Sequence, residues 1–517
     1  MQTAELVLAL LIVVAVLVSI ARRVGVAYPI FLVLGGLAIG ALPGVPRIEI
    51  EPDILFLLVL PPLLYSAAFF TPLRSFRENR GTILSLAVGL VIATAAAVAF
   101  TAHFLLPDLP WPVAIALGAI LAPPDAIAAT AVASRLAVPR AVLSILEGES
   151  LLNDATALTV YRMALLAAAA GSLAPLAAVG TFAFAAAGGA LIGLAVGWAV
   201  VHVRARVSDV PVEVTVSLLT PYAAYLPAER LGASGVIAVV VAGLYLAGRR
   251  SEFLSADTRL TGHAVWETLT FLLNSFVFVL LGFEVPFLVR HLPAADLLRL
   301  VGVGVAVTAA AVAVRAAWIF AGAGIRRLAH RGGAASGPAA SLVISWAGMR
   351  GAVSLAAALS LPLELGADPF PQREALIVVT LVVIVLTLVG QGLTLPALIR
   401  FVRLGDGGDR DEETVARRAL VESASRRIDE LYQVWPGHVP LLDQLRASYE
   451  HRSEHVERQA ASAEADRELI EHREIRRSVI GAERAALLRL RADGAIDDDL
   501  MRRLERDLDL EEQRMEA

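Results

Sequence analysis

Apolar runs long enough to cross a lipid bilayer recur along this chain and constrain its fold more than any other feature. They fall near residues 3–20, 27–43, 52–70, 82–105, 111–134, 141–170, 173–203, 211–228, 231–248, 264–289, 297–325, 338–361 and 373–401. A hydrophobic fraction of 57% excludes an ordinary soluble enzyme. Because a backbone in lipid must satisfy its own hydrogen bonds, runs of this length favour helices. The pattern predicts an all-α polytopic membrane protein with about 13 transmembrane helices.

Charged residues divide the chain into two parts. Up to about Phe401 they stand in short stretches between the apolar runs, whereas from Arg403 onward they dominate. We therefore expect a transmembrane domain over residues 1–402 and a helical cytoplasmic C-terminal domain over residues 403–517.

The tail itself has helical patterns. They cover residues 413–433 and about 449–490, followed by an expected turn at 492–494 and a charged helix that reaches Glu512. Two interpretations stay open. The tail is either a solvated helical hairpin that packs on a dimer mate or on the membrane domain, or a regulatory or ligand-sensing module.

Arginines between the apolar runs predict the orientation. Alternate loops are rich in arginine, namely Arg22 and Arg23; Arg74, Arg77 and Arg80; Arg135 and Arg140; Arg204 and Arg206; Arg249, Arg250 and Arg259; Arg326, Arg327 and Arg331. By the positive-inside rule these loops face the cytoplasm. The first run precedes its arginines, an order opposite to that of a cleaved signal peptide. We expect a multi-pass protein of the cell membrane with its N-terminus outside and its tail cytoplasmic.

Composition excludes several kinds of chemistry. The chain has neither Cys nor Lys, so disulfides, thiolate ligands, Lys nucleophiles and Schiff bases are excluded. The sequence Gly148-Glu149-Ser150 lacks the nucleophile elbow of serine hydrolases, and no His stands nearby. We expect no enzyme activity and no cofactor, and nothing in the charge pattern indicates binding to nucleic acid.

Two of the apolar runs are interrupted in mid-membrane. Two prolines break the fifth run just before Asp125, and glycines flank a buried cation in the twelfth run, at residues 347–351. Broken helices at matching positions are typical of transporters with inverted-topology repeats, whose substrate site lies where the breaks cross. We expect such repeats over about residues 1–170 and 211–401.

The sixth run contains the densest group of polar residues inside the membrane. Ser150 precedes Asp154 by one helical turn, and Glu149 precedes Asn153 in the same way, so the two pairs form adjacent stripes of one helix. A carboxylate costs roughly 2.5 kcal/mol or more at the bilayer centre. Its presence therefore indicates a path for ions or protons.

The broken fifth run adds oxygen atoms to this site. Asp125 brings a second carboxylate, Thr130 a hydroxyl, and the prolines free backbone carbonyls, a set that suits Na⁺, Li⁺ or K⁺. A carboxylate that holds either a proton or a cation produces antiport. We assign this role and the monovalent cation to Asp154, with Asn153 as a supporting amide. In the alternative interpretation, Asp154 only caps or pairs within the bundle and Asp125 caps a half-helix.

Two arginines within the apolar runs need an explanation. Arg350 in the twelfth run is permanently charged, and Glu149 is the expected partner in a structural ion pair that ties the crossing helices together. Arg162, two turns beyond Asp154, is either a second fixed charge or a residue near the membrane edge.

Three segments together resemble the monovalent cation:proton antiporter-1 family, the bacterial and eukaryotic sodium/proton exchangers. They are residues 147–154, the segment around Asp125, and residues 349–354. The resemblance covers the membrane domain, and residues 480–512 look like the tail of bacterial members. It implies a thirteen-helix fold of inverted repeats with two crossed discontinuous helices, a homodimer, and elevator-like movement of a core domain.

The resemblance also implies roles for residues. Asp154 would bind the ion and the proton, and its Asn-Asp order is similar to that of electroneutral members. Family members often carry an acidic residue after the Leu-Pro-Pro of the third run, where this chain has Ser66 as an accessory position.

These observations together predict the function. We expect exchange of cytoplasmic Na⁺ or Li⁺ for an external proton, for pH and sodium homeostasis. The nearest alternative is K⁺/H⁺ antiport. From a different class, a cation channel or a membrane sensor with the tail as its output module remains open.

Overall fold

The computed structural model describes residues 2–512 apart from short gaps. The gaps are residues 25–26, 44, 46–51, 134–135, 137, 171–174, 208, 251–253, 291, 329–336, 366–367, 403–408, 460–477, 491–499, 502–503 and 506–507. The chain divides into two compact units, Met1–Gly405 and Asp406–Ala517.

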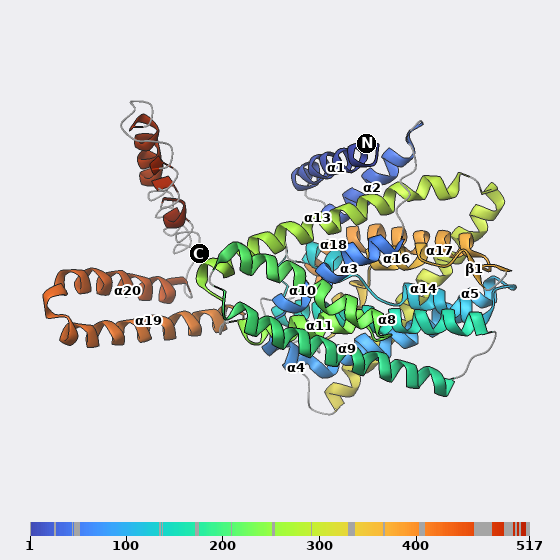
Figure 1. The fold of residues 1–517 in the computed structure, drawn as a ribbon, viewed down its shortest axis with the longest axis horizontal. Helices are drawn as coiled ribbons and strands as arrows, with labels where there is room; N and C mark the ends of the chain where they lie inside the picture. The colour runs from blue at the N-terminus through green and yellow to red at the C-terminus, as the bar shows by residue number, and fades with distance from the viewer. Residues whose placement is uncertain are drawn as a thin grey trace. The chain divides into compact units, whose positions relative to one another are not determined.

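The first unit is built of helices, many of which run lengthwise in Figure 1. In chain order they are α1 (Gln2–Val24), α2 (Tyr28–Gly40), α3 (Pro52–Phe70), α4 (Leu73–Leu84), η1 (Ser85–Leu90), α5 (Val91–Leu105), α6 (Trp111–Leu121), α7 (Ala126–Ala133), α8 (Arg140–Ala170), α9 (Pro175–Arg204), α10 (Val210–Arg230), α11 (Gly235–Ala247), α13 (Ala256–Val289), α14 (Ala294–Leu328), α15 (Pro338–Trp346), α16 (Ala352–Leu359), α17 (Arg373–Val385), η3 (Leu386–Gln391) and α18 (Gly392–Val402). Each apolar run coincides with one helix, a broken pair, or a helix containing a π-helical turn. The predicted helical membrane fold is confirmed.

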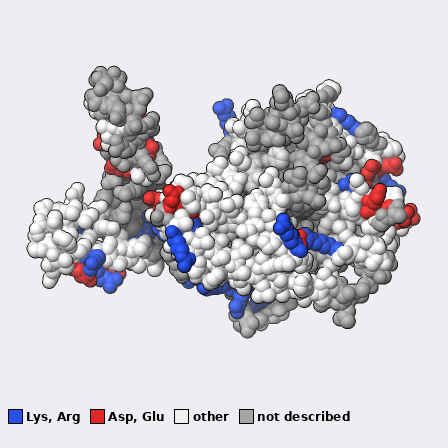
Figure 2. Space-filling model, in the orientation of Figure 1, with Lys and Arg blue, Asp and Glu red and all other residues white. Residues whose placement is uncertain are grey.

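Several of these helices meet the length and composition of a membrane span. Within the described residues they are Leu73–Leu105, Gly180–Arg204, Ala256–Val289, Ala294–Leu328 and Arg373–Val402. The face of this unit seen in Figure 2 carries few charged side chains among its described residues, as expected for a surface in contact with lipid.

Contacts between helices sort the first unit into two bundles. Helices α1–α3, α9–α11 and α13 pack mainly on one another, and we call them the scaffold bundle. Helices α4–α8 and α14–α18 do the same and form the core bundle. Contacts between the two bundles are sparser, and the assignment of inverted repeats within them stays a prediction.

Close packing of α2 on α13 depends on glycine. A Cβ on Gly36 would lie 2.1 Å from the Val279 carbonyl oxygen, and one on Gly282 would lie 1.9 Å from that of Val33. Small residues let two membrane helices approach until their backbones touch. A side chain at either position would therefore force α2 and α13 apart.

A short antiparallel pair of strands, β1 (Glu364–Leu365) and β2 (Asp368–Pro369), connects α16 to α17, with Glu364 opposite Pro369.

The second unit begins with a helical hairpin. Helix α19 (Asp409–Val434) leads through the short turn η4 (Pro436–His438) into α20 (Val439–Gln459). An Arg446–Asp429 ion pair of 2.8 Å joins the two helices. Helix α20 begins earlier than the predicted residue 449, and the predicted turn at 492–494 lies outside the described residues.

Candidate functional site

The gap between α6 and α7 lies against the gap between α15 and α16. The backbone N–H of Asp125 donates to the carbonyl of Met349 at 2.7 Å, which joins the two breaks directly. Each break exposes helix ends in the interior of the core bundle, where backbone groups without intrahelical partners need other partners.

Arg350 donates hydrogen bonds to backbone carbonyls at the carboxyl ends of the broken helices. Its Nε donates to the carbonyl of Leu121, the last residue of α6, at 2.6 Å, and its Nη1 donates to the Gly348 carbonyl just beyond α15 at 2.8 Å. Its backbone N–H donates to Thr387 in η3 at 3.0 Å. A buried guanidinium here balances the partial negative charge of two helix ends.

Asp125 lies at the opposite, amino ends of the half-helices. Its Oδ1 accepts from the N–H of Ile127 in the first turn of α7 at 2.9 Å. A Cβ on Gly351, the N-cap residue of α16, would lie only 1.7 Å from Asp125 Oδ2. Asp125 therefore caps α7, as the alternative interpretation of the sequence expected, and its negative charge also complements the start of α16.

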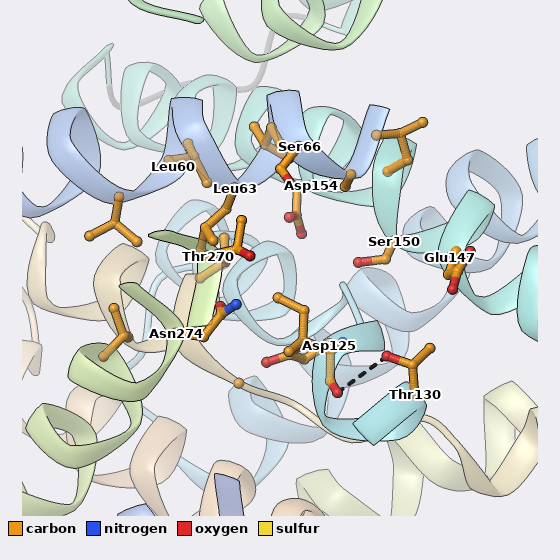
Figure 3. Close-up of a pocket in the computed structure, with 18 of the residues that line it drawn as sticks. Leu60, Leu63, Ser66, Asp125, Thr130, Glu147, Ser150, Asp154, Thr270 and Asn274 are labelled. Carbon is orange, nitrogen blue, oxygen red and sulfur yellow. Dashed lines mark hydrogen bonds between the residues drawn. The ribbon is translucent and has the colours of Figure 1, made fainter. Parts of the chain in front are cut away.

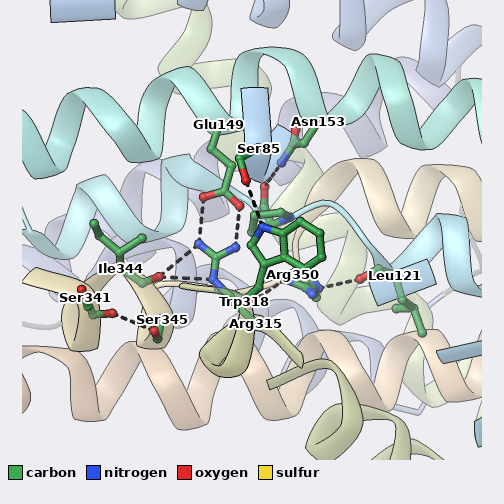
Figure 4. Close-up of polar contacts among 12 residues, drawn as sticks. Ser85, Leu121, Glu149, Asn153, Arg315, Trp318, Ser341, Ile344, Ser345 and Arg350 are labelled. Carbon is green, nitrogen blue, oxygen red and sulfur yellow. Dashed lines mark hydrogen bonds and ion pairs between the residues drawn. The ribbon is translucent and has the colours of Figure 1, made fainter. Parts of the chain in front are cut away.

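Glu149 forms its ion pair with Arg315 of α14, which corrects the expected pair with Arg350. The Arg315 Nη1 and Nη2 atoms donate to the two carboxylate oxygens of Glu149 at 2.5 and 2.8 Å, in the fork geometry shown in Figure 4. Arg315 also donates to the Ile344 carbonyl in the last turn of α15 at 3.1 Å. The pair thus joins α8, α14 and α15.

Arg350 is not available to Glu149 because the carbonyl groups at the helix ends need hydrogen-bond donors. Two backbone carbonyls already accept hydrogen bonds from the guanidinium of Arg350, so Glu149 pairs with Arg315, a second buried cation of the core bundle. Both side chains of the Glu149–Arg315 pair are almost fully buried, at 1% and 2% exposed. A cation inside the apolar run 297–325 was the one sequence signal for Arg315.

Helix α8 presents its two polar stripes to different surroundings. Asn153 is fully buried, and its Nδ2 donates to the Pro124 carbonyl in the break at 3.0 Å. Glu149 also faces the interior of the core bundle. Ser150 and Asp154 line a cavity instead. Arg350 and Asn153 donate to the carbonyls of Leu121 and Pro124 in the break. A carbonyl oxygen has two lone pairs, so the expectation that carbonyls freed by the prolines serve a cation stays a prediction.

The cavity has a volume of about 700 Å³ and lies between the two bundles. Its walls come from α3 and α13 of the scaffold bundle and from α7, α8 and α16 of the core bundle. Figure 3 shows the side chains of Asp154, Ser150 and Asn274 pointing toward the same central space. The lining residues that carry side-chain oxygen atoms include Ser66, Asp125, Thr130, Glu147, Ser150, Asp154, Thr270 and Asn274.

The structure brings most of the predicted site residues to this cavity. Ser66, at the accessory position, is one of them. Thr130 also lines it, and its hydroxyl donates to the Ile127 carbonyl at 3.3 Å. Arg162 is elsewhere: it is half exposed and pairs with Glu229 of α10 at 2.8 Å.

Asn274 is the clearest residue that sequence reasoning undervalued. It was one of several polar groups in the apolar run 264–289 and had no motif around it. Asn274 is buried, lines the cavity, and its Oδ1 has no hydrogen-bond partner. With the Asp154 carboxylate and the hydroxyls of Ser150 and Thr270, which line the same cavity, the Asn274 amide makes up a donor set that fits a monovalent cation.

Two crossed broken helices beside an acidic cavity between two helical bundles define the class of secondary membrane transporters. A family model described as "Sodium/hydrogen exchanger, transmembrane" matches residues 8–401. The chain belongs to the sodium/hydrogen exchanger family, and thus to the monovalent cation:proton antiporters.

Relatives and a solved structure agree with this. The chain is 37% identical to an uncharacterized Na⁺/H⁺ exchanger of Mycobacterium tuberculosis, over 98% of this chain and 95% of that protein. It is 31% identical to a sodium, potassium, lithium and rubidium/H⁺ antiporter of Bacillus pumilus, over 82% of this chain and 66% of that protein. The fold is similar to the sodium proton antiporter MjNhaP1 of Methanocaldococcus jannaschii, with a TM-score of 0.61 at 21% identity, over 78% of this chain and 99% of that one.

Proposed function

We propose that the chain exchanges Na⁺ or Li⁺ for a proton through Asp154, in support of pH and sodium homeostasis. One observation carries the proposal. Asp154 is a buried carboxylate, only 7% exposed, that lines the cavity. The charges of Asp125, Glu149 and Arg350 are instead engaged by helix ends or by a salt bridge.

The same arrangement supports an electroneutral cycle. A carboxylate in a site of low dielectric must be neutralised, either by a proton or by a cation. If Asp154 is the one group at the site that changes its charge state, one monovalent cation replaces one proton. The cation and the proton then each carry one positive charge across the membrane, in opposite directions, so no net charge moves.

The proposal includes an orientation. Exposed Glu147 and Glu267 line the cavity near the ends of α8 and α13 that follow arginine-rich loops. By the positive-inside rule this end faces the cytoplasm, so the cavity would admit cytoplasmic cations. The N-terminus would be outside and the tail inside the cell membrane. A homodimer, in which the scaffold bundles meet and the core bundles move, completes the proposal.

The test is transport by protein reconstituted into lipid vesicles. A pH gradient is imposed, Na⁺, Li⁺ or K⁺ is added, and the change in internal pH is followed with the membrane potential clamped or free. We expect Na⁺ and Li⁺ to dissipate the pH gradient, and the rate for each ion to be the same with the membrane potential clamped and free. Asp154→Asn should abolish the response, because a neutral amide has no negative charge to balance the cation and takes up and releases no proton.

Glu147→Gln is the matched control, since this exposed carboxylate lines the same cavity on the same helix. It should retain exchange. Normal exchange by Asp154→Asn would refute the assigned residue. Exchange with K⁺ alone would refute the choice of ion, and a current without coupled proton movement would favour a channel.

A further inference from the structure

A second cavity, of about 330 Å³, lies wholly among helix ends of the scaffold bundle. Its walls come from the ends of α3 and α9, the first turns of α10, Arg250 and Leu254 after α11, and the first turns of α13. This volume lies within the range of pockets that hold small ligands, roughly 300–1,000 Å³.

The lining of this second cavity is strongly basic. Arg204, Arg250, Arg259 and His263 all contribute to it, and its described lining residues include no Asp or Glu. Arg204 is almost fully buried and lies 3.7 Å from Glu213, which balances one of these charges. Arg250 and Arg259 are exposed at the rim. The cavity therefore keeps an excess of positive charge.

Cation exchange does not account for this cavity. A cluster of arginines repels Na⁺, so the ion path would avoid it. Among the residues that line each cavity, Phe70 is common to both, and its ring contacts His263 edge-on at 5.2 Å between centroids. The two cavities are thus neighbours separated by an aromatic wall, and they differ in the sign of their charge.

The floor of the second cavity is ordered and partly apolar. Trp266 is only 1% exposed and donates from Nε1 to Ser217 at 3.0 Å. Phe69 and Leu254 add apolar surface. A ligand suited to this cavity has an anionic head that meets the arginines and an apolar or neutral part that lies on the aromatic residues.

We propose that this cavity binds a phosphate group, carried by an anionic lipid or by a soluble phosphate ester. The planar fork of arginine matches phosphate oxygens with paired charge-assisted hydrogen bonds. The cavity also lies at the helix ends assigned to the cytoplasmic surface, where anionic lipids concentrate. A bound phosphate would hold the ends of α9, α10 and α13 together in the scaffold bundle.

Native mass spectrometry of the purified full chain tests the proposal. The detergent-solubilised protein is titrated with dioleoylphosphatidylglycerol, with soluble glycerol 3-phosphate, and with dioleoylphosphatidylcholine as the zwitterionic comparison. We expect saturable binding of phosphatidylglycerol, glycerol 3-phosphate or both, and weaker binding of phosphatidylcholine. Binding of the lipid alone identifies a lipid site, and binding of the soluble ester alone identifies a metabolite site.

Variants at the rim locate the binding. Arg250→Gln and Arg259→Gln should each weaken it at least about fivefold, because each removes one charge next to the phosphate. Arg206→Gln is the matched control. It removes the same charge from an exposed position at the end of α9 outside the cavity, and it should change binding less than about twofold.

Either of two results would overturn the proposal. One is no saturable binding of phosphatidylglycerol or of glycerol 3-phosphate, and the other is that Arg250→Gln, Arg259→Gln and Arg206→Gln weaken binding equally. Unliganded melting temperatures show whether the variants fold. If neither rim variant folds, Arg250→Lys and Arg259→Lys take their place, since they keep the charge and remove the fork. The exchange assay on Asp154→Asn is independent of all these outcomes.

Discussion

At the scale of single residues, the pairing of buried charges decides what each can do. Sequence patterns identified Glu149, Asp154 and Arg350 as buried charges but assigned Glu149 to the wrong arginine. Helix periodicity gives the face on which a residue lies, whereas a partner depends on which distant helix packs there. Arg315 is separated from Glu149 by 166 positions, and no local pattern connects the two.

The Glu149–Arg315 pair should be a stability element. Removing one partner leaves a buried charge uncompensated, so Glu149→Gln or Arg315→Met alone should lower the free energy of unfolding by about 3–5 kcal/mol. The combined Glu149→Leu, Arg315→Met variant should recover most of this loss. Thermal melting of the purified protein measures both effects. If the double variant is no more stable than the less stable of the two single variants, the pairing is contradicted.

Asn274 gives a prediction about ion affinity. Losing one cation ligand should cost about 1 kcal/mol, so Asn274→Ala should raise the Na⁺ concentration for half-maximal exchange roughly fivefold with little change in maximal rate. Ser275→Ala is the control, because Ser275 is buried beside it and does not line the cavity. Equal effects of both changes would mean that Asn274 acts only through helix packing.

At the scale of elements, the sequence predicted the positions of the helices better than their departures from regular α-helical geometry. Apolar runs are reliable because lipid leaves the backbone few alternatives. The two π-helical turns, η1 and η3, have no such signal, since a single extra residue in a turn leaves the apolar pattern almost unchanged. Yet η3 contains Thr387, whose hydroxyl accepts a hydrogen bond from the backbone N–H of Arg350.

The crossing of the broken helices should not tolerate a side chain at Gly351. A methyl group there would overlap Asp125 Oδ2, so Gly351→Ala should push α16 away from α7 and abolish exchange. Gly302→Ala is the matched control, because no atom lies within 4 Å of a Cβ at that position in α14. Exchange and melting temperature are measured for both. An active Gly351→Ala variant would show that the crossing adjusts without loss.

At the scale of the whole transmembrane unit, the two bundles are separated by the cavity at one end and joined at the other. Arg162 of α8 in the core bundle pairs with Glu229 of α10 in the scaffold bundle. The second carboxylate oxygen of Glu229 accepts from the N–H of Gly235 at 2.9 Å, which fixes its position. This contact lies toward the end of α8 opposite Glu147, so it would favour a cavity that opens to the cytoplasm.

The chain has no Cys, so one introduced Cys reports access without background. Thr270→Cys, inside the cavity, should react with a membrane-impermeant maleimide from the cytoplasmic side of oriented vesicles and little from outside. Adding Arg162→Gln should raise the outside labelling about two- to fivefold, the range expected for a partly exposed ion pair. Arg230→Gln, exposed at the same end of α10, should not. Labelling from outside alone would reverse the proposed orientation, and equal labelling with and without Arg162 would show that the Arg162–Glu229 pair does not hold the bundles.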